Sequence, residues 1–409
     1  MSSASQLALF LRNLATGILA PVLTLGLLAH GASIRTVSLL LGAYSLTVIV
    51  FEFPSGVFAD VYGRKPAFLL SLALQFAGYG VFLASRSPAP LFAAMVLSGL
   101  GRAFSSGSID ALAIDEAERG GAELAGVTAR ISILESSGLA AGALLGGLLS
   151  GVGERYAGNL LANIAIVTLL FFLTLLRVRE TPRTRAPEQR RGSRGTILEQ
   201  AKSSLAFALR KGPARPLFAL AFVTGFALLA VETYWQPAFA QADPPRWMFG
   251  VLSFAGFACV MAGSKLAEYL LGRLKGGGFG FLLGVKALLG LGLAFLYTQM
   301  LQAGFILTYL LIYVFIGGGS VAENTLLNRA VPSSRRASVL SLFSFALQIG
   351  GLLASAAGFL VSSLYGFRAM WPVAGAVMVL SVSAYAVGGG KLRPGAAARP
   401  PDSGQGRAG

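Results

Sequence analysis

The chain has 409 residues, of which 55% are hydrophobic and only 12% are charged, and its mean hydropathy is +0.70. This composition excludes a soluble globular protein, because a surface with so few charges would not stay dispersed in water. The 33 Lys and Arg residues against 17 Asp and Glu residues give a formal net charge of +16, which calls for an anionic partner or a membrane.

Long apolar segments recur along the whole chain. Each has about 20 residues, the length that a helix needs to cross about 30 Å of hydrocarbon. Twelve are predicted, at 7–29, 37–58, 66–85, 89–113, 130–151, 157–177, 215–236, 247–268, 278–298, 304–325, 338–362 and 369–388. Eleven or thirteen are the alternatives, because 278–298 and 304–325 lie close together. Twelve is favoured because it makes the two halves equal, so the predicted fold is an all-α membrane protein with 12 transmembrane helices.

The loop after the second predicted span carries the string GVFADVYGRK, which begins at Gly56. It resembles the signature between the second and third helices of the major facilitator superfamily (MFS) of secondary transporters. The glycine, aspartate and Gly-Arg-Lys of that signature correspond to Gly56, Asp60, Gly63, Arg64 and Lys65. The resemblance extends over essentially the whole chain and implies the MFS fold, in which two pseudo-symmetric six-helix bundles surround a central cavity.

The resemblance also implies a role for this loop as a gate. Asp60 would latch the two halves together on the cytoplasmic side when the cavity faces outward. Arg64 would pair with an acid at the inner end of the fourth helix, where Asp115 and Glu116 are available. Contacts that exist in only one state bias a two-state equilibrium. The alternative is that these charges only anchor the loop at the lipid headgroups.

Basic residues are concentrated on one side of the predicted spans. The loops on the other side contain only Arg35, Arg86, Arg155, Arg246 and Arg368. This asymmetry predicts a multi-pass protein of the plasma (inner) membrane with both termini in the cytoplasm. It also explains the net charge without nucleic acid, since the basic stretch 177–196 contains no aromatic residue on which a base would stack.

The predicted spans form an N-terminal bundle, residues 1–177, and a C-terminal bundle, residues 214–390. The intervening segment 178–213 is predicted to be a cytoplasmic linker, because its first part is basic and poor in large apolar residues. Its second part has apolar residues at helical spacing, which predicts an amphipathic helix on the inner leaflet. That helix either couples the two bundles or straps the membrane surface. The low-complexity tail 391–409 is predicted to be disordered.

The two bundles resemble each other in sequence. Gly138 matches Gly350 and Gly146 matches Gly358, with the same separation in both pairs. Two similar halves in the same orientation are what the architecture of the superfamily implies.

Ionisable side chains inside a span are costly to bury and are therefore functional candidates. The superfamily has an arginine in the fourth helix that is associated with proton coupling, and Arg102 lies there. The alternative is that Arg102 only closes an ion pair with Asp110 or Glu135. Glu135 and Glu52 lie in the inner thirds of their helices, where desolvation disfavours the charged form, as a proton carrier requires. The alternative is that both lie close enough to the cytoplasm to reach water or Arg12. Lys286 is expected to extend toward the inner surface.

By resemblance, the first, fourth, seventh and tenth helices line the substrate cavity. The polar residues expected on its wall are Asn13, Thr16, Arg102, Ser106, Asp110, Glu232, Tyr309, Tyr313 and Asn324. Few charges and several aromatic rings suit an amphiphilic or apolar solute. For Trp235, next to this set, a place in the aromatic belt at the membrane surface is the alternative.

Enzyme activity is not expected. One histidine, His30, and one cysteine, Cys259, cannot form a metal cluster or a nucleophile–base pair, and no GxxxxGK[ST] string is present for nucleotide binding. We therefore expect no cofactor and a monomer that moves a small organic solute by alternating access. Protons are the expected coupling ion, and efflux is favoured. The alternatives are uptake of a small organic nutrient and a membrane sensor that does not transport.

Overall fold

The computed structural model describes residues 1–106, 108–119, 123–178, 180, 215–274, 278–331 and 336–388. In these ranges the chain forms helices and loops without a β-strand. The first half contains α1 (Ser3–Leu19), α2 (Leu23–Ala29), α3 (Ile34–Tyr62), α4 (Arg64–Ala84), α5 (Pro88–Ser105), α6 (Ser108–Arg119), α7 (Leu124–Leu149) and α8 (Ala157–Arg177). The second half contains α10 (Arg215–Ala240), α11 (Trp247–Arg273), α12 (Gly278–Thr298), α13 (Gln302–Ala330), α14 (Arg336–Leu364), the 3-10 helix η2 (Phe367–Ala369) and α15 (Met370–Gly388).

The predicted all-α membrane fold is confirmed. Ten described helices are long and apolar enough to cross a membrane, and the pair α1 and α2, bent by 54°, makes an eleventh span. The predicted fourth span is divided into α5 and α6 by Ser106, whose ψ of 122° ends α5. Twelve crossings are compatible with this arrangement. The bend between α1 and α2 occurs at Pro21, a residue that lacks the N–H needed to continue a helix.

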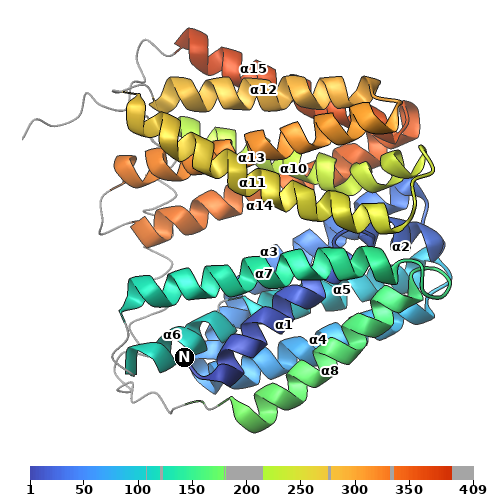
Figure 1. The fold of residues 1–409 in the computed structure, drawn as a ribbon, viewed down its shortest axis with the longest axis vertical. Helices are drawn as coiled ribbons and strands as arrows, with labels where there is room; N and C mark the ends of the chain where they lie inside the picture. Colours follow the sequence, from blue (N-terminus) through green and yellow to red (C-terminus); the bar gives the residue numbers. More distant parts are fainter. Residues whose placement is uncertain are drawn as a thin grey trace, which may run out of the picture.

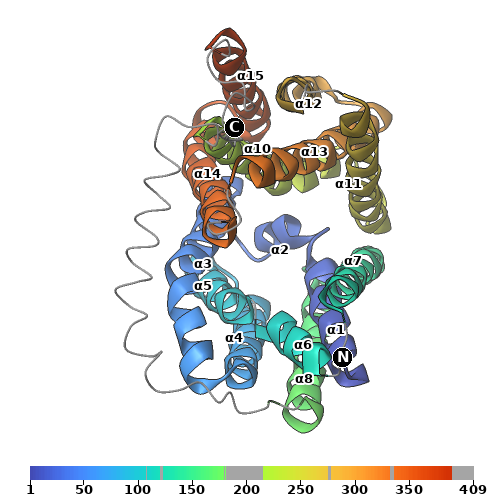
Figure 2. The same ribbon diagram turned by 90° about the vertical axis from the view of Figure 1, so that its left-hand side faces the viewer.

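The helices form two bundles that lie one above the other in Figure 1, with α1–α8 below and α10–α15 above. Inside the lower bundle α1 packs on α7 and α4 packs on α5, whereas in the upper bundle α10 packs on α14 and α11 packs on α13. The bundles meet along two flanks, α3 against α14 and α7 against α11, which Figure 2 shows from the left-hand side of Figure 1. The linker helix predicted within 178–213 and the tail 391–409 lie outside the described residues, apart from residues 178 and 180.

The outside of both bundles is apolar, as a lipid-facing surface must be. Phe53, Leu148, Leu176, Leu307 and Leu380 each expose more than 60% of their area. A soluble protein rarely leaves so many large apolar side chains in contact with water.

One glycine contact shows how closely the bundles approach each other. A Cβ atom added to Gly147 of α7 would lie only 2.7 Å from the Cα of Gly250 in α11. Any larger residue at Gly147 would push the two helices apart, and a small residue is the usual solution where membrane helices touch.

We call the two ends of the molecule, along the length of the helices, proximal and distal. The proximal end carries the N-terminus, which lies toward the left of Figure 1. The connection between α3 and α4 at Gly63 and the end of α8 at Arg177 belong to the same end. The distal end carries the loops around Gly31 and Gly153. Gly147 and Gly250 both lie toward the distal end, so this contact between the bundles is on that side.

Candidate functional site

A cavity of about 430 Å³ lies between the two bundles. Its wall comes from α3 and α5 of the lower bundle and from α10 and α14 of the upper bundle. The polar side chains on it are Tyr44, Ser45, Glu52, Arg102, Ser106, Glu232 and Gln348. Both bundles therefore contribute charged groups to one space, and a solute bound there would contact both.

Gln236 of α10 closes the distal side of this cavity. Its Oε1 accepts a hydrogen bond from the backbone N–H of Thr24 at 2.9 Å, and its Nε2 donates to the carbonyl of Ala20 at 2.8 Å. These backbone groups are available because the helix breaks between α1 and α2. The break in the first span thus supplies the groups that hold the two bundles together.

A second set of hydrogen bonds joins the bundles at the same end, and together with those of Gln236 it forms what we call the distal seal. The Tyr234 hydroxyl lies 2.5 Å from the Ser38 hydroxyl of the other bundle and accepts a hydrogen bond from Ser362 at 3.3 Å. Arg246 donates to the carbonyl of Ser150 at 3.1 Å. Tyr234 is buried, whereas Arg102 and Ser106, on the proximal side of the seal, are exposed. The cavity is therefore closed toward the distal end and opens toward the proximal end.

Arg12 of α1 holds two carboxylates in the lower bundle. Its Nη1 and Nη2 bind the two oxygens of Asp110 at 2.9 and 3.0 Å, and Nη2 also binds Oε1 of Glu135. The three side chains come from α1, α6 and α7 and are 13%, 28% and 35% exposed in that order. This group, Arg12, Asp110 and Glu135, is called the lower triad. Two carboxylates against one guanidinium leave one negative charge in excess.

Arg102 does not pair with Asp110 or Glu135, so that alternative is wrong. Its guanidinium reaches the cavity from the last turn of α5 and makes no hydrogen bond or ion pair in the part of the chain that the structure describes. The C-terminal end of a helix favours a cation nearby. Arg102 still interacts electrostatically with both Tyr44 and Glu135, so it lies between the cavity and the lower triad.

Glu232 of α10 lies on the opposite wall. One of its carboxylate oxygens, Oε1, accepts a hydrogen bond from the Tyr313 hydroxyl. The ring of Tyr313 lies 4.5 Å from that of Tyr309, which lies 5.0 Å from that of Trp235. The two tyrosines expose only 4% and 1% of their area. They support Glu232 from behind the wall instead of lining the cavity, and Trp235 is buried with them and does not belong to a surface belt.

Lys286 and Glu323 form an ion pair inside the upper bundle. The Lys286 Nζ lies 2.9 Å from Glu323 Oε1 and donates to the Thr224 hydroxyl at 2.7 Å. Both charged side chains are at most 4% exposed. The expectation that Lys286 extends to the inner surface is therefore wrong, because an acid on α13 satisfies it within the bundle. Glu323 went unrecognised in the sequence, although a lone acid within an apolar span is itself a signal.

The loop after α3 is tied to its own bundle. Gly63 has a φ of +109°, which a side chain would strain. Arg64 donates to Asp115 at 2.6 Å, and the backbone N–H groups of Arg64 and Lys65 bind Glu180 at 2.5 and 3.1 Å. The structure thus brings Arg64 to Asp115, as the resemblance implies.

The second acid on α6, Glu116, has a different partner. Its carboxylate accepts hydrogen bonds from the backbone N–H of Ser2 at 2.8 Å and from the Ser5 hydroxyl at 2.7 Å. Burial alone would raise the pKa of Glu116, but the bonds from Ser5 and Ser2 outweigh it and lower that pKa. Glu116 therefore fixes the start of α1. Gly56 and Asp60 are exposed on the last turns of α3.

Three predicted cavity residues bond within their own helices. Asn13 donates to the carbonyl of Leu9, Thr16 to that of Arg12, and Asn324 to that of Ser320. These three lie outside the wall of the 430 Å³ cavity, whereas Glu52 belongs to it and accepts a 3.3 Å hydrogen bond from Gln348 of the other bundle.

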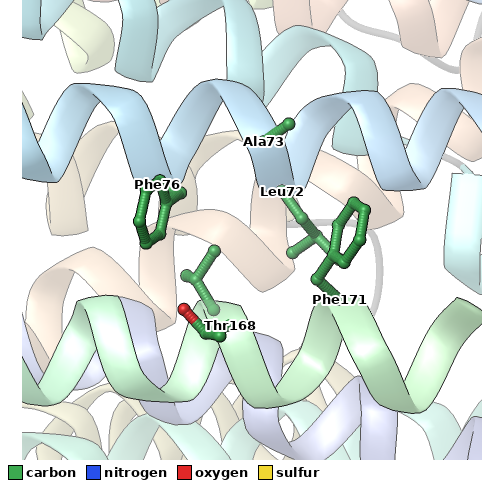
Figure 3. A pocket seen from close by; sticks show the side chains of 6 residues that line it. Leu72, Ala73, Phe76, Thr168 and Phe171 are labelled. Atoms are coloured by element: carbon green, nitrogen blue, oxygen red, sulfur yellow. The ribbon is translucent and has the colours of Figure 1, made fainter.

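A smaller pocket of about 210 Å³ lies between α4 and α8, away from the cavity. Figure 3 shows Leu72, Ala73, Phe76 and Phe171 around it together with Thr168. The Thr168 hydroxyl donates to the carbonyl of Ile164 in its own helix. The pocket therefore suits an apolar chain better than a polar solute. Within the described ranges, no group of three or more His, Cys, Asp and Glu residues is arranged to hold a metal ion.

Comparisons with known proteins agree with this architecture. The family model described as Major Facilitator Superfamily matches residues 7–355. The uncharacterized MFS-type transporter YxaM of Bacillus subtilis (strain 168) is 22% identical over 381 residues, which cover 92% of this chain and 93% of that protein.

Solved structures share the fold at low sequence identity. A mutant form of the nucleoside transporter NupG is 14% identical with a TM-score of 0.80, covering 94% of this chain and 98% of that one. A bacterial homologue of the iron transporter ferroportin, in an inward-facing state, is 18% identical with a TM-score of 0.70, covering 94% of this chain and 100% of that one.

Proposed function

The chain belongs to the major facilitator superfamily, and from this premise we propose that it exports a small organic solute in exchange for protons. Membership makes it a multi-pass membrane transporter of a small molecule and points away from an enzyme. The coupling ion and the direction of transport are inferred from the cavity and from the charges beside it.

The observation that carries the proposal is the lower triad. The three side chains together carry one negative charge in excess, which Arg102 offsets only from a distance, without an ion pair. A charge within a membrane-spanning bundle is costly, and binding of a proton removes it. Glu135 is the proton carrier in this proposal. Both terminal nitrogens of Arg12 bind Asp110, whereas only one binds Glu135. Protonation of Glu135 therefore weakens one charged hydrogen bond, and protonation of Asp110 would weaken two. The 35% exposure of Glu135 allows water to reach it.

The distal seal supports an inward-facing state. Basic residues such as Arg64, Lys65, Arg130, Arg273 and Arg329 lie at the proximal end, which by the charge rule faces the cytoplasm of the plasma membrane together with both termini. The cavity then receives solute from the cytoplasm. Rocking of the two bundles would break the bonds of Gln236 and Tyr234 and open the distal end.

The loop after α3 acts as the proximal gate in this proposal. In the present state Arg64 pairs with Asp115 and Glu180 binds the start of α4, both within the lower bundle. The gate set consists of Gly56, Asp60, Gly63, Arg64, Lys65, Asp115 and Glu116. In the outward-facing state, Asp60 at the exposed end of α3 would latch the two bundles.

Exchange is favoured over co-transport because the cavity wall carries acids. Glu52 and Glu232 line the cavity and Glu135 lies beyond Arg102. A cationic group of the solute on this wall and a proton on Glu135 repel each other, so one is released when the other binds. Where protons enter down their gradient, such competition drives the solute outward.

The test uses inverted membrane vesicles that contain the full chain and an interior acidified before the assay. A panel of radiolabelled organic amines, acids and amino acids is offered from outside. Export predicts pH-driven accumulation of at least one compound above that in empty vesicles. Glu135→Gln should abolish the pH dependence while exchange of labelled for unlabelled solute continues. Glu154→Gln, in the exposed distal loop, is the matched control and should leave accumulation unchanged.

Three outcomes contradict the proposal. Accumulation that needs an acidic exterior of right-side-out vesicles would indicate uptake. Unchanged pH dependence in Glu135→Gln would remove the triad from the coupling. Binding without flux above empty vesicles would indicate a sensor.

A further inference from the structure

Arg102 and Glu232 present two unmatched charges to one cavity. Arg102 lies on the wall from the lower bundle and Glu232 on the wall from the upper bundle, and both are exposed. Among the described residues neither has an ion-pair partner. Lone charges at this depth in a membrane protein are costly, and a bound ligand is the usual reason for keeping them.

The two charges are also separated along the membrane normal. From the rise of an α-helix, Arg102 lies about 21 Å from the distal start of α5 at Pro88. By the same measure, Glu232 lies about 12 Å from the distal end of α10 at Ala240, so the two positions differ in depth by about 9 Å. The wall includes the apolar side chains of Val48, Leu228 and Leu229. The cavity thus offers a cation site, an apolar stretch and an anion site.

We propose that the solute carries an amine and a carboxylate at opposite ends of a short apolar body. The amine binds the Glu232 carboxylate, whose Oε1 is already held by Tyr313 and whose other oxygen is left for the ligand. The solute carboxylate binds the Arg102 guanidinium, which matches it in two-pronged geometry. Glu52 is the remaining acid on the wall, and Gln348 already donates to it. This inference rests on the proposed function, because it takes the cavity to be the transport site.

Such a solute does what a singly charged one cannot. It neutralises the charges of Arg102 and Glu232, and among the described residues of the wall only Glu52 then keeps a charge without an ionic partner. It also joins the two bundles, because Arg102 belongs to α5 and Glu232 to α10. A site with two charged partners inside the membrane rejects an analogue that lacks either group, since one partner is then left unpaired.

The test is binding of three matched probes to the purified full chain in lipid nanodiscs by isothermal titration calorimetry. The probes are 6-aminohexanoate, hexylamine and hexanoate, which share the carbon chain and differ in the charged ends. We expect 6-aminohexanoate to bind at least about 10-fold more tightly than either analogue. Arg102→Gln should weaken 6-aminohexanoate to the level of hexylamine and leave hexylamine unchanged. Glu232→Gln should weaken it to the level of hexanoate and leave hexanoate unchanged.

Arg35→Gln at the distal end is the control and should bind all three probes as the unmodified chain does, and gel filtration of each variant verifies folding. The inference fails if hexylamine binds as tightly as 6-aminohexanoate, if Arg102→Gln changes the affinity for 6-aminohexanoate less than about twofold, or if 6-aminohexanoate does not bind. Proton-driven flux of another compound would then leave the proposed function standing. Binding of 6-aminohexanoate with loss in both variants, but without flux in vesicles, would sustain this inference and refute the proposed function.

Discussion

Arg12 and Thr224 occupy equivalent positions in the two bundles. Their separation in the sequence equals that between Gly138 and Gly350, and each lies in the third turn of the first helix of its bundle. Each also touches an acid on the fourth predicted span of its half, since Arg12 binds Asp110 of α6 and the Thr224 hydroxyl lies 3.2 Å from Glu323 of α13. The same separation aligns Asp110 with Ala322, so the acid of the second half stands one residue later, at Glu323, and a threonine replaces the arginine that faces it.

The Lys286–Glu323 pair of the upper bundle and the lower triad therefore differ in charge balance and in access to water. In the upper bundle the cation comes from Lys286 of α12, and one ammonium balances one carboxylate out of contact with water. In the lower triad one guanidinium faces two partly exposed carboxylates. The balanced, sealed pair suits a structural role, and the unbalanced, accessible one suits a group that gains and loses a proton.

The first prediction concerns the sealed pair. Lys286→Met should lower the stability of the upper bundle by about 3–5 kcal/mol, because it leaves Glu323 buried without a cation. Removing both charges in Lys286→Met/Glu323→Leu should restore most of the loss. The melting temperature of the purified protein, followed by loss of the monodisperse peak in gel filtration, measures both.

The surface pair Lys265 and Glu268 provides the control for that measurement. Its side chains are 83% and 67% exposed, and an exposed ion pair contributes little to the free energy of unfolding. Lys265→Met should leave the melting temperature within the scatter of repeats. A double variant of Lys286 and Glu323 that melts no higher than Lys286→Met would show that the pair does more than balance charge.

The second prediction separates the two acids of the lower triad. Glu135→Gln should raise the melting temperature, because it removes the excess negative charge and keeps the bidentate bond between Arg12 and Asp110. Asp110→Asn should lower it, because a neutral amide replaces the carboxylate that accepts two charged hydrogen bonds. The melting temperature of each variant at neutral pH, compared with that of the unmodified chain, shows whether the substitution stabilises or destabilises the protein. Equal effects of the two substitutions would mean that the carboxylates share the guanidinium evenly.

Much of the fold could be predicted from the sequence, because the length of an apolar run shows whether it can span a membrane. A run of about 20 apolar residues can only be a spanning helix, and the charged loop from Gly56 to Lys65 carries a pattern specific enough to indicate the family. The pairing of Arg64 with Asp115 followed from that pattern. The two helix breaks were not predicted. Pro21 was a visible signal for the first, and the run Ser105, Ser106 was a weaker one for the second.

The partners inside the bundles could not be predicted in the same way. A membrane helix is apolar on all sides, so its periodicity does not reveal which face meets which neighbour. Arg12 and Lys286 each stand alone on their own helices, and their acids come from α6, α7 and α13. Tyr309 and Tyr313 were expected on the cavity wall for the same reason, and the rotation of α13 places them behind it.

The third prediction concerns the distal seal. Gln236→Leu should leave the N–H of Thr24 and the carbonyl of Ala20 without their partner, which costs the sealed state about 1–3 kcal/mol and shifts molecules toward the outward-facing state. In a Cys259→Ser background, a cysteine introduced by Ser38→Cys should then react faster with a membrane-impermeant maleimide added from outside. Gln241→Leu, at an exposed distal position, should leave the rate unchanged. The same rate in both variants would mean that Gln236 does not hold the seal.

The fourth prediction uses the only histidine of the chain. His30 ends α2 at the distal end, 1% exposed, with its Nδ1 at 2.9 Å from the carbonyl of Gly26 and its ring against Phe82. Burial lowers the pKa of His30, and Arg86 and Arg155 add to this effect against the opposing bond to Gly26.

A lowered pKa in the folded state means that the unfolded state binds the proton more readily. The contribution of His30 to stability is therefore full above the unfolded value of about 6.5 and is lost as the pH falls below it. The melting temperature should decline between pH 7 and pH 5, and His30→Gln should make that decline shallower, because glutamine does not titrate. The difference between the two curves isolates His30 from the carboxylates, which are present in both proteins. Parallel curves over this range would show that the folded protein binds a proton at His30 as readily as the unfolded chain does.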